Sequence, residues 1–322
     1  MVTFVQTLSK AVALGAIYSI MGLSFVLIFK GTQVLNFAAG AISMAGALFM
    51  SIMIADAGFP FLPFANPLAP EPGETASIPL WIVHLVMALV LAAIMGLVLE
   101  RIAIRPMVGQ PLFALAVVTL GLEIAIRPFN LDATAITGRS IGVPWGNETW
   151  NIGGAVFPKS YLAAIIAAAI AFAFVFWFYR SRFGVAMRAV AFDQEAAMAQ
   201  GINVGRVFAM AWGLGAALAT MAAIFFAMSP WPPAGVVSLE IPPVWVFRVL
   251  PVIILGGLDS VVGVIFGGLI IASCEIFAGQ YLASYTSILG PGYSTVVPYL
   301  VMLAVLLIKP YGLFGTPEIR RV

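Results

Sequence analysis

Few ionisable side chains in this sequence could do chemistry, and one pair stands inside an apolar run. At Glu123, an acidic side chain in the middle of a membrane helix would cost roughly 2.5–3.5 kcal/mol on insertion scales. Arg127 follows four residues later, the spacing at which two side chains meet on one helix face. We predict an ion pair that faces the interior of a bundle. The alternative that Glu123 contacts the ammonium group of a passing amino acid stays open.

Two further polar residues lie among apolar neighbours. Asn36 follows a short polar stretch, and an amide inside a membrane either bridges two helices or lines a pathway. Glu275, next to Cys274 at the end of a glycine-rich stretch, is predicted to lie at the membrane interface.

The sequence contains few residues that could act in catalysis or bind a metal ion. The sequence has one histidine, His84, and one cysteine, so no Cys/His set can hold structural zinc and no intramolecular disulfide can form. No G-x-S-x-G and no G-x-x-x-x-G-K-[ST] motif occurs. We therefore expect no catalytic residue, no metal and no cofactor, and we place His84 near the outer membrane surface.

Composition excludes a water-soluble globule. Hydrophobic residues make up 62% and charged residues 9% of the 322 positions, against roughly 45–50% and 25% in soluble domains. The net charge is +2 without a basic run, so nucleic acid is not an expected partner. Lipid must surround most of the chain.

The elements that position these side chains are predicted to be membrane helices. A helix needs about 20 apolar residues to cross the bilayer, and no period-two alternation typical of barrel strands is present. We predict an all-α helical bundle formed by one transmembrane domain over residues 1–322. The clear spans are residues 11–29, 34–55, 79–99, 111–126, 161–179, 207–228 and 296–308.

Residues 243–279 differ from these spans. Arg248 and Asp259 interrupt the apolar sequence, and five glycines crowd the region between Gly256 and Gly268. Two short membrane segments or a re-entrant pair are predicted, which gives about seven to nine segments in all. Paired short segments broken by glycine point to a transport site.

Lysine and arginine in short loops set the orientation of a membrane protein. Ten of the fifteen basic residues can be placed on one side, which is predicted to be cytoplasmic: Lys30, Arg101, Arg105, Arg180, Arg182, Arg188, Arg206, Lys309, Arg320 and Arg321. The N-terminus is then outside and the C-terminus inside. Two loops, residues 56–77 and 127–160, become external lids or docking surfaces.

Residues 180–206 form a polar interruption between two strong spans. Residues 187–200 contain good helix formers, and Gly201 and Asn203 supply a stop. We predict one short helix at the cytoplasmic face. From the residues alone, a surface for another protein and a solvated amphipathic loop are equally open.

Three segments carry a resemblance to a known family. They are RAVAFDQEAAMAQGIN at 188–203, ALGAIYSIMGLSFVLIFKGTQVLNFAAGAISMAGAL at 13–48, and VLPVIILGGLDSVVGVIFGGLIIASCEIF at 249–277. In that family's order, they resemble the permease subunits of branched-chain amino-acid ABC importers, and the resemblance spans nearly the whole chain.

The resemblance implies a set of partners. They are two cytoplasmic ATP-binding subunits, a second permease subunit that is a different chain, an extracytoplasmic substrate-binding protein and membrane lipid. It implies a multi-pass protein of the bacterial inner membrane that forms a translocation pathway and leaves ATP hydrolysis to its partners.

The resemblance also suggests roles for individual residues. It implies coupling to the ATPase through Arg188, Ala189, Asp193, Ala197, Gly201 and Ile202. The match of the Asn-Phe-Ala core makes Asn36, Phe37 and Gly40 candidates for the pathway, and Glu123 joins them as the buried acid.

The substrate stays open between branched-chain amino acids, urea and short-chain amides. Many relatives carry His and Glu after the Asn-Phe-Ala core, where this chain has alanine and glycine. A secondary transporter driven by ions or protons is the alternative function. It would need inverted repeats and buried ion ligands, and Glu123 is its only support.

Overall fold

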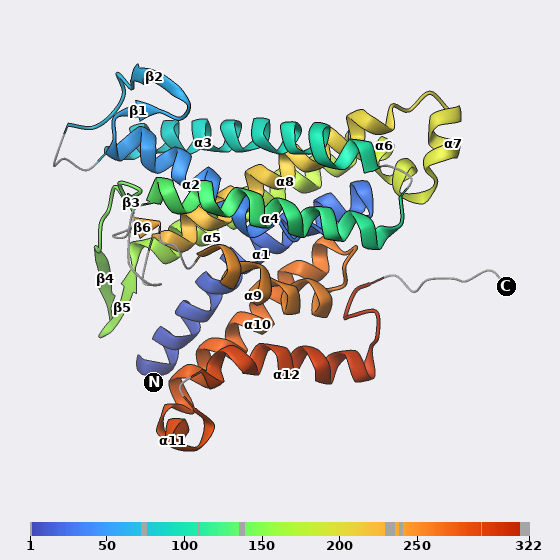
Figure 1. Cartoon of the computed structure of the whole chain (residues 1–322). Helices are drawn as coiled ribbons and strands as arrows, with labels where there is room; N and C mark the ends of the chain where they lie inside the picture. The colour runs from blue at the N-terminus through green and yellow to red at the C-terminus, as the bar shows by residue number, and fades with distance from the viewer. Residues whose placement is uncertain are drawn as a thin grey trace.

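The computed structural model describes residues 2–71, 76–107, 110–134, 139–228, 236–237, 241–290 and 292–315. The helices run side by side along one direction (Figure 1). One end of the bundle carries three two-stranded sheets and the start of the chain, and we call it the hairpin end. The other end carries two short helices, α6 (Arg182–Phe192) and α7 (Gln194–Ala199), and we call it the coupling end.

In the part of the chain that the structure describes, six helices are long and apolar enough to cross a membrane. They are α1 (Val2–Thr32), α3 (Ile78–Leu99) with its extension η1 (Glu100–Ile104) and η2 (Arg105–Met107), α4 (Leu112–Thr134), α5 (Lys159–Arg180), α8 (Val204–Ala227) and α10 (Val261–Tyr281). A bent pair adds a seventh candidate: η3 (Ala283–Tyr285) and α11 (Thr286–Leu289) meet α12 (Tyr293–Ile308) at 83°. Two shorter apolar helices, α2 (Ala39–Ala55) and α9 (Ile241–Gly256), complete the predicted range.

The glycine-rich pair predicted within residues 243–279 is present, and its two halves are unequal. α9 has 16 residues, whereas α10 has 21 and is of full spanning length. The break lies between them, where Gly257 has φ +105, a conformation that L side chains rarely adopt. α10 is longer than the charge spacing suggests because the helix continues through Glu275 instead of ending there.

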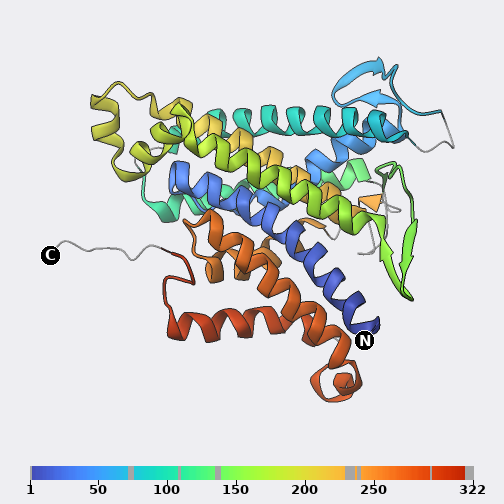
Figure 2. The ribbon, with the colours of Figure 1, turned by 180° about the vertical axis from the view of Figure 1, so that it is seen from behind.

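α1 lies at the centre of the bundle. Seen from behind, it runs between α5 and α10 (Figure 2). Small residues allow the approach of α10, since a β-carbon on Gly268 would lie 2.7 Å from the carbonyl oxygen of Gly15. A β-carbon on Gly267 would likewise meet the carbonyl oxygen of Val252, so both glycines allow close helix packing.

The connection from α1 to α2 is irregular. The predicted span 34–55 is helical only from Ala39, and the chain leaves α1 through Gln33, whose φ is +58. The side-chain oxygen of Asn36 accepts the backbone N–H of Ala38 at 3.1 Å. This local bond competes with helix formation, as short polar side chains do, so α2 begins later than the apolar run.

The hairpin end gathers the two predicted outer loops. β1 (Gly58–Phe59) pairs with β2 (Leu62–Ala65), and β4 (Thr149–Ile152) pairs with β5 (Ala155–Pro158). β3 (Arg139–Ser140) pairs with β6 (Val236–Val237), which ties two distant stretches of chain together. The second loop begins later than residue 127 because α4 continues to Thr134.

His84, which we expected near the outer membrane surface, is fully buried at this end of the bundle. One ring nitrogen lies 2.8 Å from the carbonyl oxygen of Leu80, and the other lies 2.9 Å from the side-chain nitrogen of Asn66. Because Asn66 belongs to the first outer loop, the ring fastens that loop to α3.

The basic residues predicted to share one side lie together at the coupling end. Those described are at or near the ends of helices that meet there: Lys30, Arg101, Arg105, Arg180, Arg182, Arg188, Arg206 and Lys309. Arg320 and Arg321 lie outside the described residues. The start of α1 and the end of α12 lie at opposite ends of the bundle (Figure 1).

Candidate translocation and coupling sites

A polar stripe on α4 faces the start of α2. Thr119, Glu123, Arg127 and Asn130 recur at spacings of four, four and three, which places them along one side of the helix. We call these four residues the α4 seam. Thr119 Oγ1 donates to the carbonyl oxygen of Leu35 at 3.0 Å and accepts the N–H of Phe37 at 3.2 Å. The seam thus satisfies irregular backbone that would be costly in lipid.

Glu123 closes the first turn of α2. Its Oε2 accepts the backbone N–H of Ala41 at 2.8 Å, and its Oε1 lies 3.6 Å from Nη2 of Arg127. The predicted ion pair is therefore present. The contact with α2 was not predicted, and it is favourable because a negative charge complements a helix N-terminus. Oε1 makes no hydrogen bond with any residue that the structure describes.

The four candidate pathway residues converge at this place. Asn36 and Phe37 lie in the irregular connection, Gly40 lies in the first turn of α2, and Glu123 reaches that turn from α4. Asn36 is 2% exposed and is engaged with its own backbone. The opposite face of α4 is apolar and exposed, with Phe113 and Ile124 its most open side chains, so α2 is the principal neighbour of α4 within the chain.

The coupling segment is two helices, not the single helix predicted over residues 187–200. Asp193 is extended, with φ −157, and its Oδ1 accepts the N–H of Ala196 at 2.9 Å. Aspartate is unfavourable in a helix interior but favourable as an N-cap. Asp193 therefore ends α6 and begins α7. The predicted stop is confirmed: Gly201 has φ +79, and Asn203 caps α8 by accepting the N–H of Arg206.

α6 rests on the ends of the central helices. Its buried face consists of Gly184, Met187 and Val190, at spacings of three. The Met187 side chain occupies the space beside Gly31 at the end of α1. Arg188 donates from Nη1 to the carbonyl oxygen of Tyr179 at 2.6 Å, which fastens α6 to the end of α5.

The six candidate coupling residues do not share one exposed surface. Arg188, Asp193 and Gly201 are exposed, and Ala189 and Ile202 are half-buried. Ala197 is buried, and its carbonyl oxygen accepts the N–H of Ile202 at 3.0 Å. It therefore belongs to the packed side of α7.

Sequence reasoning missed the exposed apolar side chains on the coupling segment, which include Phe183 and Val185 on α6. Phe192 is 94% exposed at the junction of α6 and α7, and Met198 is 54% exposed on α7. The sequence feature that could have indicated an exposed Phe192 is its place directly before Asp193, a residue that disfavours a helix interior, in an otherwise polar stretch.

A buried ion pair next to the coupling segment was also missed. Glu100 is fully buried, and Arg105 lies 3.0 Å from it and donates to the carbonyl oxygen of Gly205 at 3.0 Å. Glu100 opens a π-helical turn, and the spacing of five residues between the partners equals the spacing of the backbone hydrogen bonds in such a turn. The pair joins the end of α3 to the start of α8.

The second membrane glutamate, Glu275, is buried where three helices meet. Tyr18 donates its hydroxyl to Oε2 at 2.7 Å, and Nη1 of Arg248 lies 3.3 Å from Oε1. These partners come from α1 and α9. Arg248 and Tyr18 compensate the negative charge of Glu275 inside the bundle, so α10 can contain this acidic residue.

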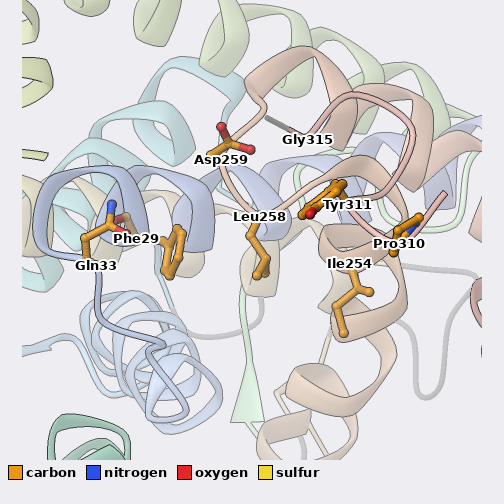
Figure 3. A pocket seen from close by; sticks show the side chains of 8 residues that line it. All are labelled: Phe29, Gln33, Ile254, Leu258, Asp259, Pro310, Tyr311 and Gly315. Carbon is orange, nitrogen blue, oxygen red and sulfur yellow. The ribbon is translucent and has the colours of Figure 1, made fainter. Parts of the chain in front are cut away.

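Two cavities open at the coupling end. One of about 340 Å³ lies between the end of α1, the turn from α9 to α10, and the residues after α12 (Figure 3). Phe29 and Gln33 line one side, and Pro310 and Tyr311 line another. A neighbouring cavity of about 380 Å³ is lined by charged side chains from three elements: Lys30, Arg188 and Asp259. Asp259 borders both, so the two cavities adjoin, and the second reaches α6 through Arg188.

Comparisons with known proteins agree with this architecture. A family model described as the branched-chain amino acid transport system permease component matches residues 7–306. The chain is similar to the high-affinity branched-chain amino acid transport system permease protein LivH of Salmonella typhimurium, with 26% identity over 326 residues, 99% of this chain and 98% of LivH. BraD of Pseudomonas aeruginosa, a permease protein of the same description, is 25% identical over 99% of this chain and 98% of its own length. A probable LivH of Methanocaldococcus jannaschii is 32% identical over 42% of each chain.

Proposed function

This chain belongs to the family of branched-chain amino acid transport permease components, and on that premise we propose that it carries branched-chain amino acids inward across a bacterial inner membrane. It is a multi-pass permease subunit of an ABC importer. Such permeases work with ATP-binding subunits and a substrate-binding protein. The observation that carries the proposal is the match of 7–306 together with the two-helix segment at one end of the bundle.

We propose that the coupling end faces the cytoplasm. Eight basic residues gather there, which supports the positive-inside orientation. The N-terminus is then outside, the C-terminus inside, and the three two-stranded sheets face the compartment from which solute arrives.

In this orientation α6 and α7 dock into the ATP-binding subunits, one of which serves this chain and the other a second, different permease chain. Phe192 and Met198 supply exposed apolar area, and Asp193 and Glu195 stand beside them. Aromatic side chains in a polar surround are typical anchors of protein interfaces. Phe192 is thus the principal anchor.

Movement of the docked segment would reach the membrane helices through three contacts. Met187 packs beside Gly31 of α1, Arg188 holds the end of α5, and α6 also packs against α8. Because these contacts are packed or charged, α6 cannot shift alone. Closure of the ATP-binding subunits would therefore displace α1, α5 and α8 together.

The proposed pathway runs beside the α4 seam. Irregular backbone at membrane depth is tolerated where protein or a water-filled cavity surrounds it, and Asn36, Phe37 and Gly40 lie at such a place. Glu123 borders it with one carboxylate oxygen that makes no hydrogen bond with the described residues. That oxygen suits the ammonium group of an amino acid, which urea lacks.

The substrate-binding protein is proposed to dock on the hairpin end. Phe61 and Phe64 of the first hairpin are 73% and 64% exposed. Phe61 also stacks on Phe129 of α4, with ring centroids 5.6 Å apart and planes at 19°. Docking on this hairpin would therefore affect α4, the helix that carries the α4 seam, through the contact between Phe61 and Phe129.

The test is ATP hydrolysis by the assembled importer in lipid vesicles, with the chain co-expressed with its neighbouring permease and ATP-binding subunits. Binding protein loaded with leucine should stimulate hydrolysis, whereas protein loaded with urea or an amide should not. Phe192→Asp should abolish co-purification of the ATP-binding subunits, and Phe192→Leu, which keeps the apolar contact, should retain it. Full assembly and transport with Phe192→Asp would contradict the docking surface, and stimulation by urea alone would contradict the substrate.

A further inference from the structure

Two adjoining hollows lie at the hairpin end, on either side of the first part of α1. The first is a polar cavity of about 580 Å³ between α1, α10 and α12. Its polar lining includes Gln6, Lys10, Glu275, Gln280 and Ser294. It therefore presents one cationic and one anionic side chain to the same space.

The second hollow is an apolar groove of about 460 Å³ between α1 and α5. It is lined mainly by aliphatic side chains: Val5, Leu8, Val12, Leu162 and Ile165. Pro158 and Tyr161 border both hollows, so the groove continues into the polar cavity. A single ligand that fills both would need a charged part and a hydrocarbon part.

The depth of the pair matches the boundary of the bilayer. α1 has 31 residues, a length of about 46 Å at 1.5 Å per residue, against about 30 Å of hydrocarbon. About 8 Å therefore extends beyond the hydrocarbon at each end, and Lys10 lies roughly 12 Å from the start of the helix, just inside the boundary. Trp150 and Tyr161 line the groove at this level, and tryptophan and tyrosine are enriched at membrane interfaces.

The charges define the polar part of the ligand. Glu275 already accepts from Tyr18 and pairs with Arg248, but a carboxylate has about four acceptor positions and keeps capacity for a further donor. Lys10 offers an ammonium group that a phosphate can contact, and its long stem lets the head reach toward the interface.

We propose that the two hollows together bind one phospholipid with a zwitterionic ethanolamine headgroup. One acyl chain lies in the groove, the phosphate meets Lys10, and the headgroup ammonium meets Glu275. A choline headgroup cannot donate a hydrogen bond to the carboxylate, and a glycerol headgroup offers it no cation. A free amino acid could pair with Lys10 and Glu275 but would leave the apolar groove unfilled. The groove therefore favours a lipid as the ligand.

Such a lipid would join four membrane helices that the chain itself connects only in part. α1 and α10 hold the headgroup, α12 closes the cavity through Ser294, and α5 holds the acyl chain. The site is independent of the solute that the permease carries.

The test is lipid retention by the permease purified with its partner subunits in mild detergent, measured by native mass spectrometry. The complex is offered phosphatidylethanolamine, phosphatidylcholine and phosphatidylglycerol of matched acyl chains. We expect one phosphatidylethanolamine per chain to survive activation that removes the other two. Equal retention of the three lipids by the unmodified protein would overturn the proposal, whatever the variants do.

Variants then test the headgroup contact and the acyl-chain contact separately. Lys10→Gln should lower retention about fivefold, the order of one partly exposed charged contact, and Lys10→Arg should preserve it. Ile165→Trp should fill the groove and displace the lipid, whereas Ile170→Trp, at a position on α5 that is 60% exposed and outside the groove, should not. Unchanged retention in both Lys10→Gln and Ile165→Trp, or displacement by excess leucine, would show that no lipid occupies this site.

Discussion

Two glutamates lie inside the membrane-spanning bundle, and each stands beside an arginine, yet they are held in different ways. Glu275 is fixed by side chains from two other helices, Tyr18 on α1 and Arg248 on α9. Glu123 contacts an arginine of its own helix and the backbone of α2. One acid therefore joins three central helices, and the other joins a peripheral helix to the start of a short one.

The difference separates a structural contact from a site that can move. Displacing Glu275 would disturb α1, α9 and α10, which pack closely on one another. Displacing Glu123 disturbs mainly the contact between α4 and α2, because α4 has few other neighbours in the chain. Ionisable residues inside a membrane mark functional pathways by default, and this comparison supports the proposal that Glu123 borders the pathway and Glu275 belongs to the scaffold.

The largest expected effect comes from breaking the Glu275 cluster. Arg248→Leu leaves a buried carboxylate without its cation, which costs about 3–5 kcal/mol of unfolding free energy. We expect little folded protein in membranes, measured by gel filtration of the solubilised chain and by SDS-induced unfolding. The double variant Arg248→Leu/Glu275→Leu removes both charges and should recover most of the loss. Normal stability of the single variant would mean that Glu275 is not held by this pair.

A smaller effect on stability, with a larger effect on transport, is expected from Glu123→Gln. The amide oxygen can still accept the N–H of Ala41, so only the charge is lost, and the cost should be about 1–2 kcal/mol. Leucine uptake into vesicles, corrected for the amount of folded complex, should fall at least severalfold if Glu123 borders the pathway.

The control for Glu123→Gln is Glu100→Gln, which alters a buried acid paired with Arg105 away from the proposed pathway. It should lower stability without changing competition of uptake by isoleucine or valine. If Glu123→Gln also lowers yield while leaving uptake per folded complex and substrate preference unchanged, Glu123 is a structural cap like Glu275 and the comparison fails.

The two glutamates also show which parts of this molecule the sequence could predict. Arg127 follows Glu123 by four residues, so helix periodicity alone predicts that pair. Tyr18 is 257 positions from Glu275, and no local pattern connects them, so the sequence alone did not predict this contact. The spans and the stop at Gly201 were predictable for the same local reason.

Competition between local and tertiary contacts explains the remaining differences. Asp193 lies among good helix formers, and its capping bond divided the predicted helix. Residues 34–38 are apolar enough to continue a span, but Asn36 and Thr119 satisfy their backbone in an irregular form. Such outcomes depend on which partner a side chain meets, and composition does not carry that information.

A third change sharpens the contrast through a single hydroxyl. Tyr18→Phe removes the hydrogen bond to Glu275 but keeps the ring and the Arg248 pair, so it should cost about 1–2 kcal/mol, the range for a hydrogen bond to a charged group. Transport per folded complex should be unchanged, because the cluster is scaffold. Ser24→Ala, which removes another hydroxyl donor of α1 to a buried backbone oxygen, serves as the control for loss of a neutral hydrogen bond. A specific loss of uptake with Tyr18→Phe alone would place the cluster in the pathway.

The smallest expected effect is that of Arg127→Gln. The Arg127 side chain is 43% exposed and lies 3.6 Å from Glu123, so the pair is partly solvated and should contribute about 0.5 kcal/mol. The Ala41 contact remains, so α2 should keep its position and leucine uptake should stay within about twofold of the unmodified protein. The matched comparison is Arg248→Leu, which alters the same residue type beside a buried glutamate and should be several times more costly. Equal losses from the two variants, measured by SDS-induced unfolding, would show that Glu123 is as firmly held as Glu275 and that α4 is not the more mobile element.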